Sequence, residues 1–261
     1  MVRRLVAWLP FVLLGLVLLA WLWPLLLGET LFWGLPALQF YPWRAFAFDE
    51  LRAGRLPLWN PYNGGGAPLL ANYQVAVLYP PNWLHMILPH VTAMNVLAVG
   101  HLVWAAVGMW RFAAAWKLPD WGRGVSMLAF ALSGYLVGRL GSFPMTAAAS
   151  WLPWLFLAAH RLVVAEHRAR PTVIWALVVA MVLLAGHAQT AYYALLGAAA
   201  YILWLGWQVQ TGRARVVAWA WAVAWPPLSS CRRSNFSAGR TGPPGWTMTG
   251  RPISVTRWRG R

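Results

Sequence analysis

One uncharged tract, Pro171 to Gly212, constrains the fold more than any other part of the sequence. It contains no Asp, Glu, Lys or Arg, and about 20 apolar residues are enough for a helix to cross the hydrocarbon core of a membrane. The tract is too long for one crossing, so we expect a tight turn near GHAQT to divide it. Because the chain is 60% hydrophobic and 10% charged, a soluble domain would lack the polar residues to cover its surface. The sequence predicts an all-α, polytopic membrane protein.

Six segments have the length and apolar character of membrane-spanning helices. They are Leu5–Leu27, Val91–Trp110, Gly124–Leu140, Pro144–Leu162, Thr172–Gly186 and Ala191–Trp207. A seventh apolar run, Val216–Leu228, is too short to span. The predicted architecture is a transmembrane helix bundle of about six spans plus a truncated seventh, with a large structured first external loop at about residues 29–90.

The basic residues predict the orientation of this bundle. The formal charge of +16 would suit a nucleic-acid-binding protein, but Lys and Arg lie in short clusters between apolar runs, so we expect membrane lipid and no nucleic acid as a partner. If Arg3 and Arg4 hold the N-terminus in the cytoplasm, the later clusters also fall on that side, as the positive-inside rule requires. These clusters are Arg111, Lys117 and Arg123, then Arg161, Arg168 and Arg170, then Arg213 and Arg215. We predict a multi-pass plasma-membrane protein with a cytoplasmic N-terminus.

Acidic residues are concentrated in the external loop. Of five in the chain, Glu29, Asp49 and Glu50 lie there. Paired carboxylates such as Asp49 and Glu50 could act as a general base for a hydroxyl acceptor or as ligands of a divalent cation. The alternative is that FDELRAGRL forms one amphipathic interfacial helix, on which both carboxylates are only solvated beside Arg52 and Arg55.

The rest of the loop is rich in Pro, Gly, aromatic and amide residues. NGGGAP lacks the Lys-Ser/Thr of a nucleotide-binding loop, so we predict turn and packing roles for its glycines. The aromatic residues either anchor the loop at the headgroup level or stack on a sugar, and the polar residues either bind a ligand or satisfy the loop's own backbone. The substrate-binding candidates of this kind are Trp59, Asn60, Tyr62, Asn72, Gln74 and Tyr79, with His187 and Gln189 in the predicted hairpin.

The composition changes after Leu228. Residues 229–261 contain seven Arg and no acidic residue. This stretch is either a disordered basic tail that binds anionic lipid or, as we prefer, the product of a reading-frame shift or truncation that removed the second half of the seventh helix. We therefore divide the chain into a membrane module, 1–228, and a tail, 229–261. A single cysteine, Cys231, excludes an internal disulfide and a zinc site with paired cysteines.

Two stretches resemble a known family. LRAGRLPLWNPYNGGGAPLLANYQVAVLYPPNWL is similar to the first external loop of the bacterial YfhO family of membrane proteins, and AGHAQTAYYALLGAAAYILW resembles a later helical hairpin of that family. FPMTAAASWLPW fits the segment between them. The resemblance covers about Glu29 to Gly212, and full members of the family are much longer, so the chain looks like the N-terminal part of one.

The family is similar to GT-C glycosyltransferases, which use a polyprenyl-phosphate sugar donor and carry an acidic catalytic residue in the first external loop. The resemblance implies that Asp49 or Glu50 is the base for the acceptor hydroxyl, or the ligand of a divalent cation, and that Arg44 or Arg52 meets the donor phosphate. Many relatives carry an Asp shortly before the piece that here reads QFYPWR, and this chain has none between Glu29 and Asp49.

The resulting expectation is a membrane-embedded glycosyltransferase in the bacterial plasma membrane, acting at the external face on a polyprenyl-phosphate-linked sugar, or an inactive truncated form of one. The alternatives are a non-catalytic polytopic protein that binds or transports a lipid-linked sugar, and a non-functional fragment. Few polar residues lie within the predicted spans and no internal repeat is evident, which counts against a transporter.

Overall fold

The computed structural model describes residues 2–26, 29, 34, 36–167 and 169–209. The chain divides into two units, residues 1–214 and 215–261, and the description below concerns the first. The short seventh run, Val216–Leu228, and the basic tail lie outside the described residues.

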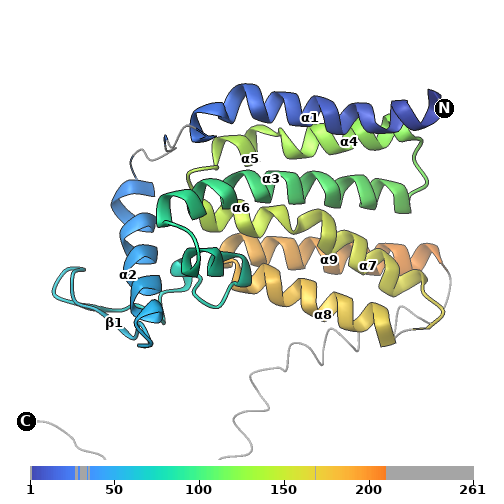
Figure 1. Cartoon of the computed structure of the whole chain (residues 1–261). Helices are drawn as coiled ribbons and strands as arrows, with labels where there is room; N and C mark the ends of the chain where they lie inside the picture. Colours follow the sequence, from blue (N-terminus) through green and yellow to red (C-terminus); the bar gives the residue numbers. More distant parts are fainter. Residues whose placement is uncertain (1, 27–28, 30–33, 35, 168, 210–261) are drawn as a thin grey trace, which may run out of the picture. The chain divides into compact units, whose positions relative to one another are not determined.

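The described part is mostly helical, which confirms the all-α prediction. The longer helices lie side by side, and a shorter helix, α2, lies at one end of them (Figure 1). The α-helices are α1 (Val2–Leu26), α2 (Tyr41–Arg52), α3 (His90–Ala115), α4 (Asp120–Ala131), α5 (Gly134–Gly138), α6 (Phe143–Ser150), α7 (Leu152–Val164), α8 (Ala169–Leu184) and α9 (Ala188–Gln208).

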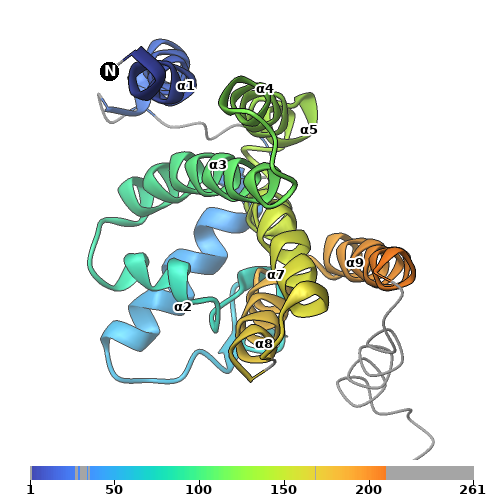
Figure 2. The same cartoon turned by 90° about the vertical axis from the view of Figure 1, so that its right-hand side faces the viewer.

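Helix α3 is the centre of the packing. It lies between α4 on one side and α6 and α7 on the other (Figure 2). Its Met94, Leu102 and Ala105 are fully buried, and a Cβ at Gly108 would lie only 2.6 Å from the indole of Trp154 on α7. Small residues at this crossing let the two helix backbones approach closely, which is the usual way in which helices pack in membranes.

Two helical segments are long and apolar enough to cross a membrane, judged over the described residues. They are His90–Ala115, and α6 with α7 taken together as Phe143–Val164, and they coincide with the second and fourth predicted spans. Leu9–Ala20 and Ala169–Leu184 are apolar but shorter.

The third predicted span, Gly124–Leu140, is not one helix. It is α4 followed by α5, with a break at Leu132 and Ser133. The Ser133 hydroxyl accepts a hydrogen bond from the backbone N–H of Leu136 at 3.4 Å, so it caps a new helix instead of continuing the old one. The sequence analysis did not recognise this cap inside an apolar run.

The predicted turn near GHAQT is present between α8 and α9. Gly186 has φ +93°, a conformation that L side chains rarely adopt. A Cβ on this residue would lie 2.9 Å from Ala76 and from the carbonyl oxygen of Tyr73, and the Tyr73 hydroxyl donates a hydrogen bond to the carbonyl of Leu183. The turn is thereby fixed against the loop that precedes α3.

From residue 36 onward that loop has a defined structure, as its Pro and Gly content predicts. After a π-helical turn at Pro36–Phe40 and α2, it forms a small antiparallel pair, β1 (Trp59–Asn60) with β2 (Ala67–Pro68), in the register Trp59↔Pro68. Two 3-10 helices follow, Tyr73–Val75 and Pro80–Met86. Gly66 has φ +108°, and a Cβ there would lie 2.5 Å from the Trp59 indole, so this glycine serves the turn and the packing.

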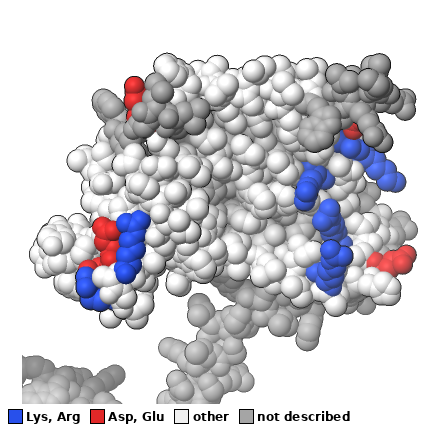
Figure 3. Space-filling model, viewed as in Figure 1, with Lys and Arg blue, Asp and Glu red and all other residues white. Residues whose placement is uncertain are grey.

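Charge is distributed unequally over the two ends of the helices. Figure 3 shows mainly basic side chains, with acidic ones beside them, at the end where α3 joins α4 and α7 joins α8, and a mixed acidic and basic group over α2 at the other end. The α7–α8 connection contributes Arg161 and Arg170, and Asp120 near the α3–α4 connection pairs with Arg123. The two ends of the helices therefore differ in their balance of basic and acidic side chains.

Candidate functional site

The two candidate catalytic carboxylates, Asp49 and Glu50, lie next to each other on α2 but have different partners. Glu50 forms two hydrogen bonds with the Arg55 guanidinium, at 2.6 and 2.8 Å, and these lower the pKa of Glu50. Asp49, whose side chain is 58% exposed, contacts Arg52 at 3.3 Å and His90 at 3.0 Å. Only Asp49 has an imidazole beside it, so only Asp49 belongs to a carboxylate–histidine pair.

The Asp49–His90 pair continues inward to His85. The Nδ1 atoms of His90 and His85 are 3.3 Å apart. An ionised carboxylate only accepts, so His90 Nε2–H donates to Asp49, and in the neutral ring its Nδ1 accepts from His85 Nδ1–H. His85 Nε2 then carries a lone pair, and this buried atom has no hydrogen-bond partner among the described residues.

Burial is the main reason that His85 stays neutral. The side chain is fully buried and stacks on Phe48 with ring centroids 5.1 Å apart. Desolvation, followed by the positive charge of Arg44, lowers the pKa of His85 to about 3. A neutral ring, which carries its one proton on Nδ1, can hold His90 and Asp49 in one orientation.

Arg52 joins α2 to the segment that carries His85. Its guanidinium donates to the carbonyl oxygens of His85 at 2.5 Å and Leu88 at 2.8 Å, besides contacting Asp49. Three acceptors therefore hold this arginine, and its role in the structure is to fix the position of α2 against the 3-10 helix Pro80–Met86.

Arg44 is a buried cation without an acidic partner. Its side chain is 2% exposed, its guanidinium lies 5.2 Å from the Phe143 ring centroid, and Nε has no hydrogen-bond partner among the described residues. All five acidic residues of the chain lie in the described part, and none is within ion-pair distance of Arg44. Burial lowers the pKa of Arg44 to about 10, so the group remains charged at neutral pH.

An aromatic pocket of about 430 Å³ lies between the loop and α3. Its polar groups belong to Tyr79, His101 and Trp151, and Trp104 and Pro80 form part of its apolar wall. Arg44 is not among the residues that line this pocket. Pockets with mostly apolar walls and a few fixed polar groups are typical ligand sites.

The polar groups of this pocket form one directed hydrogen-bond chain. The Trp151 indole N–H donates to the Tyr79 hydroxyl at 2.7 Å, and the Tyr79 oxygen is 2.9 Å from His101 Nε2. His101 Nδ1 is 2.6 Å from the Leu97 carbonyl. Since a carbonyl only accepts, Nδ1 carries the proton, Nε2 accepts, and the Tyr79 hydroxyl donates to it. Every member is paired, which fixes the shape of the pocket.

The other loop candidates mostly satisfy the loop itself. Asn60 Oδ1 accepts from the N–H of Tyr62 at 3.0 Å, and Asn72 Oδ1 accepts from the N–H of Gln74 at 3.1 Å. Gln74 also accepts from the Gln39 side chain at 2.9 Å. Trp59 covers Gly66, and Tyr62 is 83% exposed, with its ring edge against Phe46. Of the two roles open for Asn60 and Asn72, the structure supports the backbone one.

The two hairpin candidates also have local partners. His187 caps α9, because its Nδ1 accepts from the N–H of Thr190 at 3.1 Å. Gln189 Nε2 lies 3.5 Å from the Tyr193 hydroxyl and is exposed. Neither residue lines the aromatic pocket.

The sequence analysis missed three residues of this region: His85, His90 and Trp151. His85 and His90 share the stretch HMILPH, but their partner Asp49 lies 41 residues before His90, so no local pattern signals the contact. Within the described part of the chain no group of three or more His, Cys, Asp or Glu could hold a metal ion. Asp49 and Glu50 have separate cationic partners, which does not fit a shared divalent cation.

Comparison with protein-family models, with curated proteins and with solved structures finds no match.

Proposed function

We propose that this chain is a membrane-embedded protein that binds the phosphate of a polyprenyl-phosphate-linked sugar at its external face and, as a GT-C-like glycosyltransferase, transfers the sugar. The observation that carries the proposal is Arg44. A buried guanidinium without a carboxylate partner costs stability, and an anion that completes the site would offset this cost. The resemblance to the YfhO family indicates the lipid-linked sugar.

Membrane embedding is supported by the outer surfaces of the helices. Two segments are long and apolar enough to cross, and large apolar side chains are exposed on others, among them Leu16 on α1, Leu177 on α8 and Leu203 on α9. In water such surfaces would drive association. In the proposed topology of about six spans, the basic end of the helices faces the cytoplasm and α2 faces outward.

In this proposal Asp49 is the catalytic base. Its carboxylate takes the proton of the acceptor hydroxyl while the acceptor oxygen bonds to the anomeric carbon, and the bond from that carbon to the donor phosphate oxygen breaks, leaving its electron pair on the phosphate. His90 orients the carboxylate. Arg44 stabilises the charge on the phosphate, and the rings of the aromatic pocket offer stacking surfaces for the sugar.

Sugar transfer by the full chain in lipid vesicles, with radiolabelled polyprenyl-phosphate hexoses as donors, tests these roles. Asp49→Asn is expected to lower the rate by at least about a hundredfold. Glu50→Gln is the matched control, because it changes the neighbouring carboxylate, which pairs with Arg55, and should leave the rate within about twofold. Equal rates for both variants would remove Asp49 from the mechanism.

Donor binding is measured separately from transfer. Arg44→Gln should abolish retention of the labelled donor, whereas Arg44→Lys keeps the charge and should retain part of it. A wild-type chain that binds the donor and transfers nothing is a non-catalytic lipid-sugar binder, and one that binds no donor refutes the proposal.

A further inference from the structure

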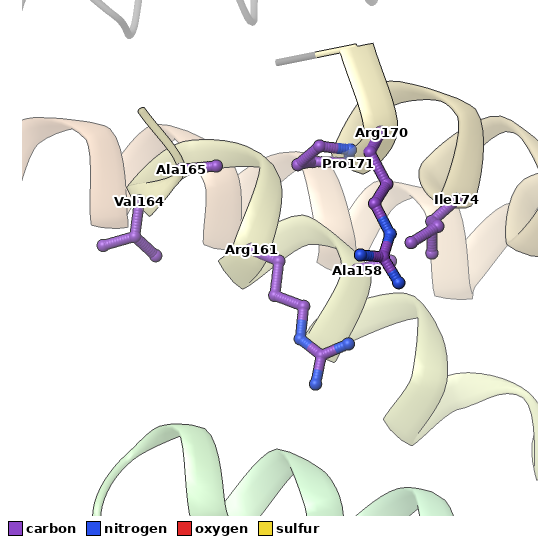
Figure 4. A pocket seen from close by; sticks show the side chains of 7 residues that line it. All are labelled: Ala158, Arg161, Val164, Ala165, Arg170, Pro171 and Ile174. Atoms are coloured by element: carbon purple, nitrogen blue, oxygen red, sulfur yellow. The ribbon is translucent and has the colours of Figure 1, made fainter. Parts of the chain in front are cut away.

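A second pocket lies between α7 and α8, on the connection between these two helices. It has a volume of about 440 Å³, and its wall contains Arg161 from α7 and Arg170 from α8. Figure 4 shows both arginine side chains extending from their helices in a similar direction, with the guanidinium group of Arg170 beside Ala158 and Ile174. The pocket thus combines two cations with an apolar wall.

The charges of these two arginines are not neutralised within the described part of the chain. Neither Arg161 nor Arg170 is within ion-pair distance of a carboxylate there. Glu166 lies in the same connection and is exposed, without forming such a pair. The pocket is therefore a site of positive potential open to the surroundings.

Helix stability explains only one of the two arginines. Arg161 lies in the last turn of α7, where a cation interacts favourably with the helix dipole. Arg170 lies in the first turn of α8, where the same dipole makes a cation unfavourable. The position of Arg170 calls for a negative partner from outside the described chain.

We propose that this pocket binds the phosphodiester headgroup of an anionic phospholipid. Two guanidinium groups from different helices can each form two parallel hydrogen bonds with phosphate oxygens, and basic pockets at the cytoplasmic ends of membrane helices suit such headgroups. A lipid fits better than free phosphate, because the wall beside the arginines is apolar, and Val173 and Leu177 on the exposed side of α8 continue that surface. The inference rests on membrane embedding and is independent of sugar transfer.

Native mass spectrometry of the full chain in detergent, titrated with phosphatidylglycerol or phosphatidylcholine, tests the site. The wild type should bind phosphatidylglycerol at least about tenfold more tightly than phosphatidylcholine, since charge-assisted hydrogen bonds are lost with the neutral lipid. The double variant Arg161→Gln/Arg170→Gln should lose that preference.

The matched control is Arg111→Gln/Arg123→Gln, which removes the same charge from the same end of the helices outside the pocket. Arg111 lies over the Trp154 ring, and Arg123 pairs with Asp120. This control should keep the wild-type preference. Equal loss in both double variants would mean that only general surface charge attracts the lipid and would overturn the proposal.

Two further results separate the possible failures. Displacement of phosphatidylglycerol by inorganic phosphate in large excess would identify a soluble anion as the ligand and refute the lipid. Extraction of the chain from cells without detergent would refute membrane embedding itself, and with it the basis of both proposals. Sugar transfer that persists in the Arg161→Gln/Arg170→Gln variant while lipid preference is lost supports two separate sites.

Discussion

Replacing Arg44 with Met is expected to stabilise the protein, although the site is buried. Burial lowers the pKa of Arg44 from its ordinary value to about 10, and one pKa unit corresponds to 1.36 kcal/mol, so the site disfavours the charged form by about 3 kcal/mol. The Phe143 ring returns about 1 kcal/mol through its cation–π contact. Met is similar in length and brings no charge, so the free energy of unfolding should rise by about 2 kcal/mol.

Thermal unfolding of the full chain in detergent, followed by circular dichroism, measures this effect. For a domain of this size, 2 kcal/mol corresponds to a rise in Tm of about 6 °C. Arg52→Met is the control, because it removes an arginine of the same helix that donates to the carbonyls of His85 and Leu88. That variant should unfold at a lower temperature than the wild type.

A fall in Tm for Arg44→Met equal to that for Arg52→Met would refute the reasoning. It would mean that the protein compensates the Arg44 charge, and that the site has no need of an external anion. We expect Arg44→Met to be more stable than the wild type and to lose binding of the lipid-linked donor. Residues placed for function often reduce stability, so replacing them commonly raises stability at the expense of function.

Three further predictions concern the loop and its contacts. Folding lowers the pKa of His85 to about 3, from about 6.5 in the unfolded chain. The free energy of unfolding should therefore be unaffected by this group above pH 6.5 and fall by about 1.4 kcal/mol per pH unit as the pH falls from 6.5 toward 3. In thermal melts over that range His85→Gln should show a shallower decline than the wild type, and equal slopes would contradict this. Tyr79→Phe leaves the Trp151 indole N–H unpaired and should lower the free energy of unfolding by about 1 to 3 kcal/mol. The control is Tyr62→Phe at an exposed position, and an equal loss of unfolding free energy in the two variants would contradict the hydrogen-bond network. Gly186→Ala should cost about 2 kcal/mol because of its positive φ, and an unchanged Tm would show that the turn adapts.

The sequence predicted those features that depend on local composition. The division of the long uncharged tract into α8 and α9 followed from its length, and the ordered shape of the loop followed from its Pro and Gly residues. Helix breaks inside apolar runs were missed. Ser133 caps α5 in the middle of a predicted span, and the end of α6 at Ser150 precedes Pro153 in the first turn of α7.

The candidate site was predicted only in part, for a physical reason. Asp49 was identified by its charge in an apolar chain and Arg44 by the family resemblance, but neither reveals which side chain is buried and which is solvated. Arg44 is inside and Asp49 outside, although both lie on α2. The contacts of Asp49 with His90 and of Tyr79 with Trp151 join residues 41 and 72 positions apart, and such distances leave no periodic signal.

The hydrogen-bond chain through Tyr79 has a consequence for proton permeability. It begins at the Trp151 indole, which can only donate, and ends at the Leu97 carbonyl, which can only accept. A proton wire conducts because each of its members can reverse its direction after a proton has passed, and here the two ends forbid that reversal. If the helices lie in a membrane as proposed, this hydrogen-bond chain gives protons no path past His101, and the polar pocket does not dissipate a proton gradient.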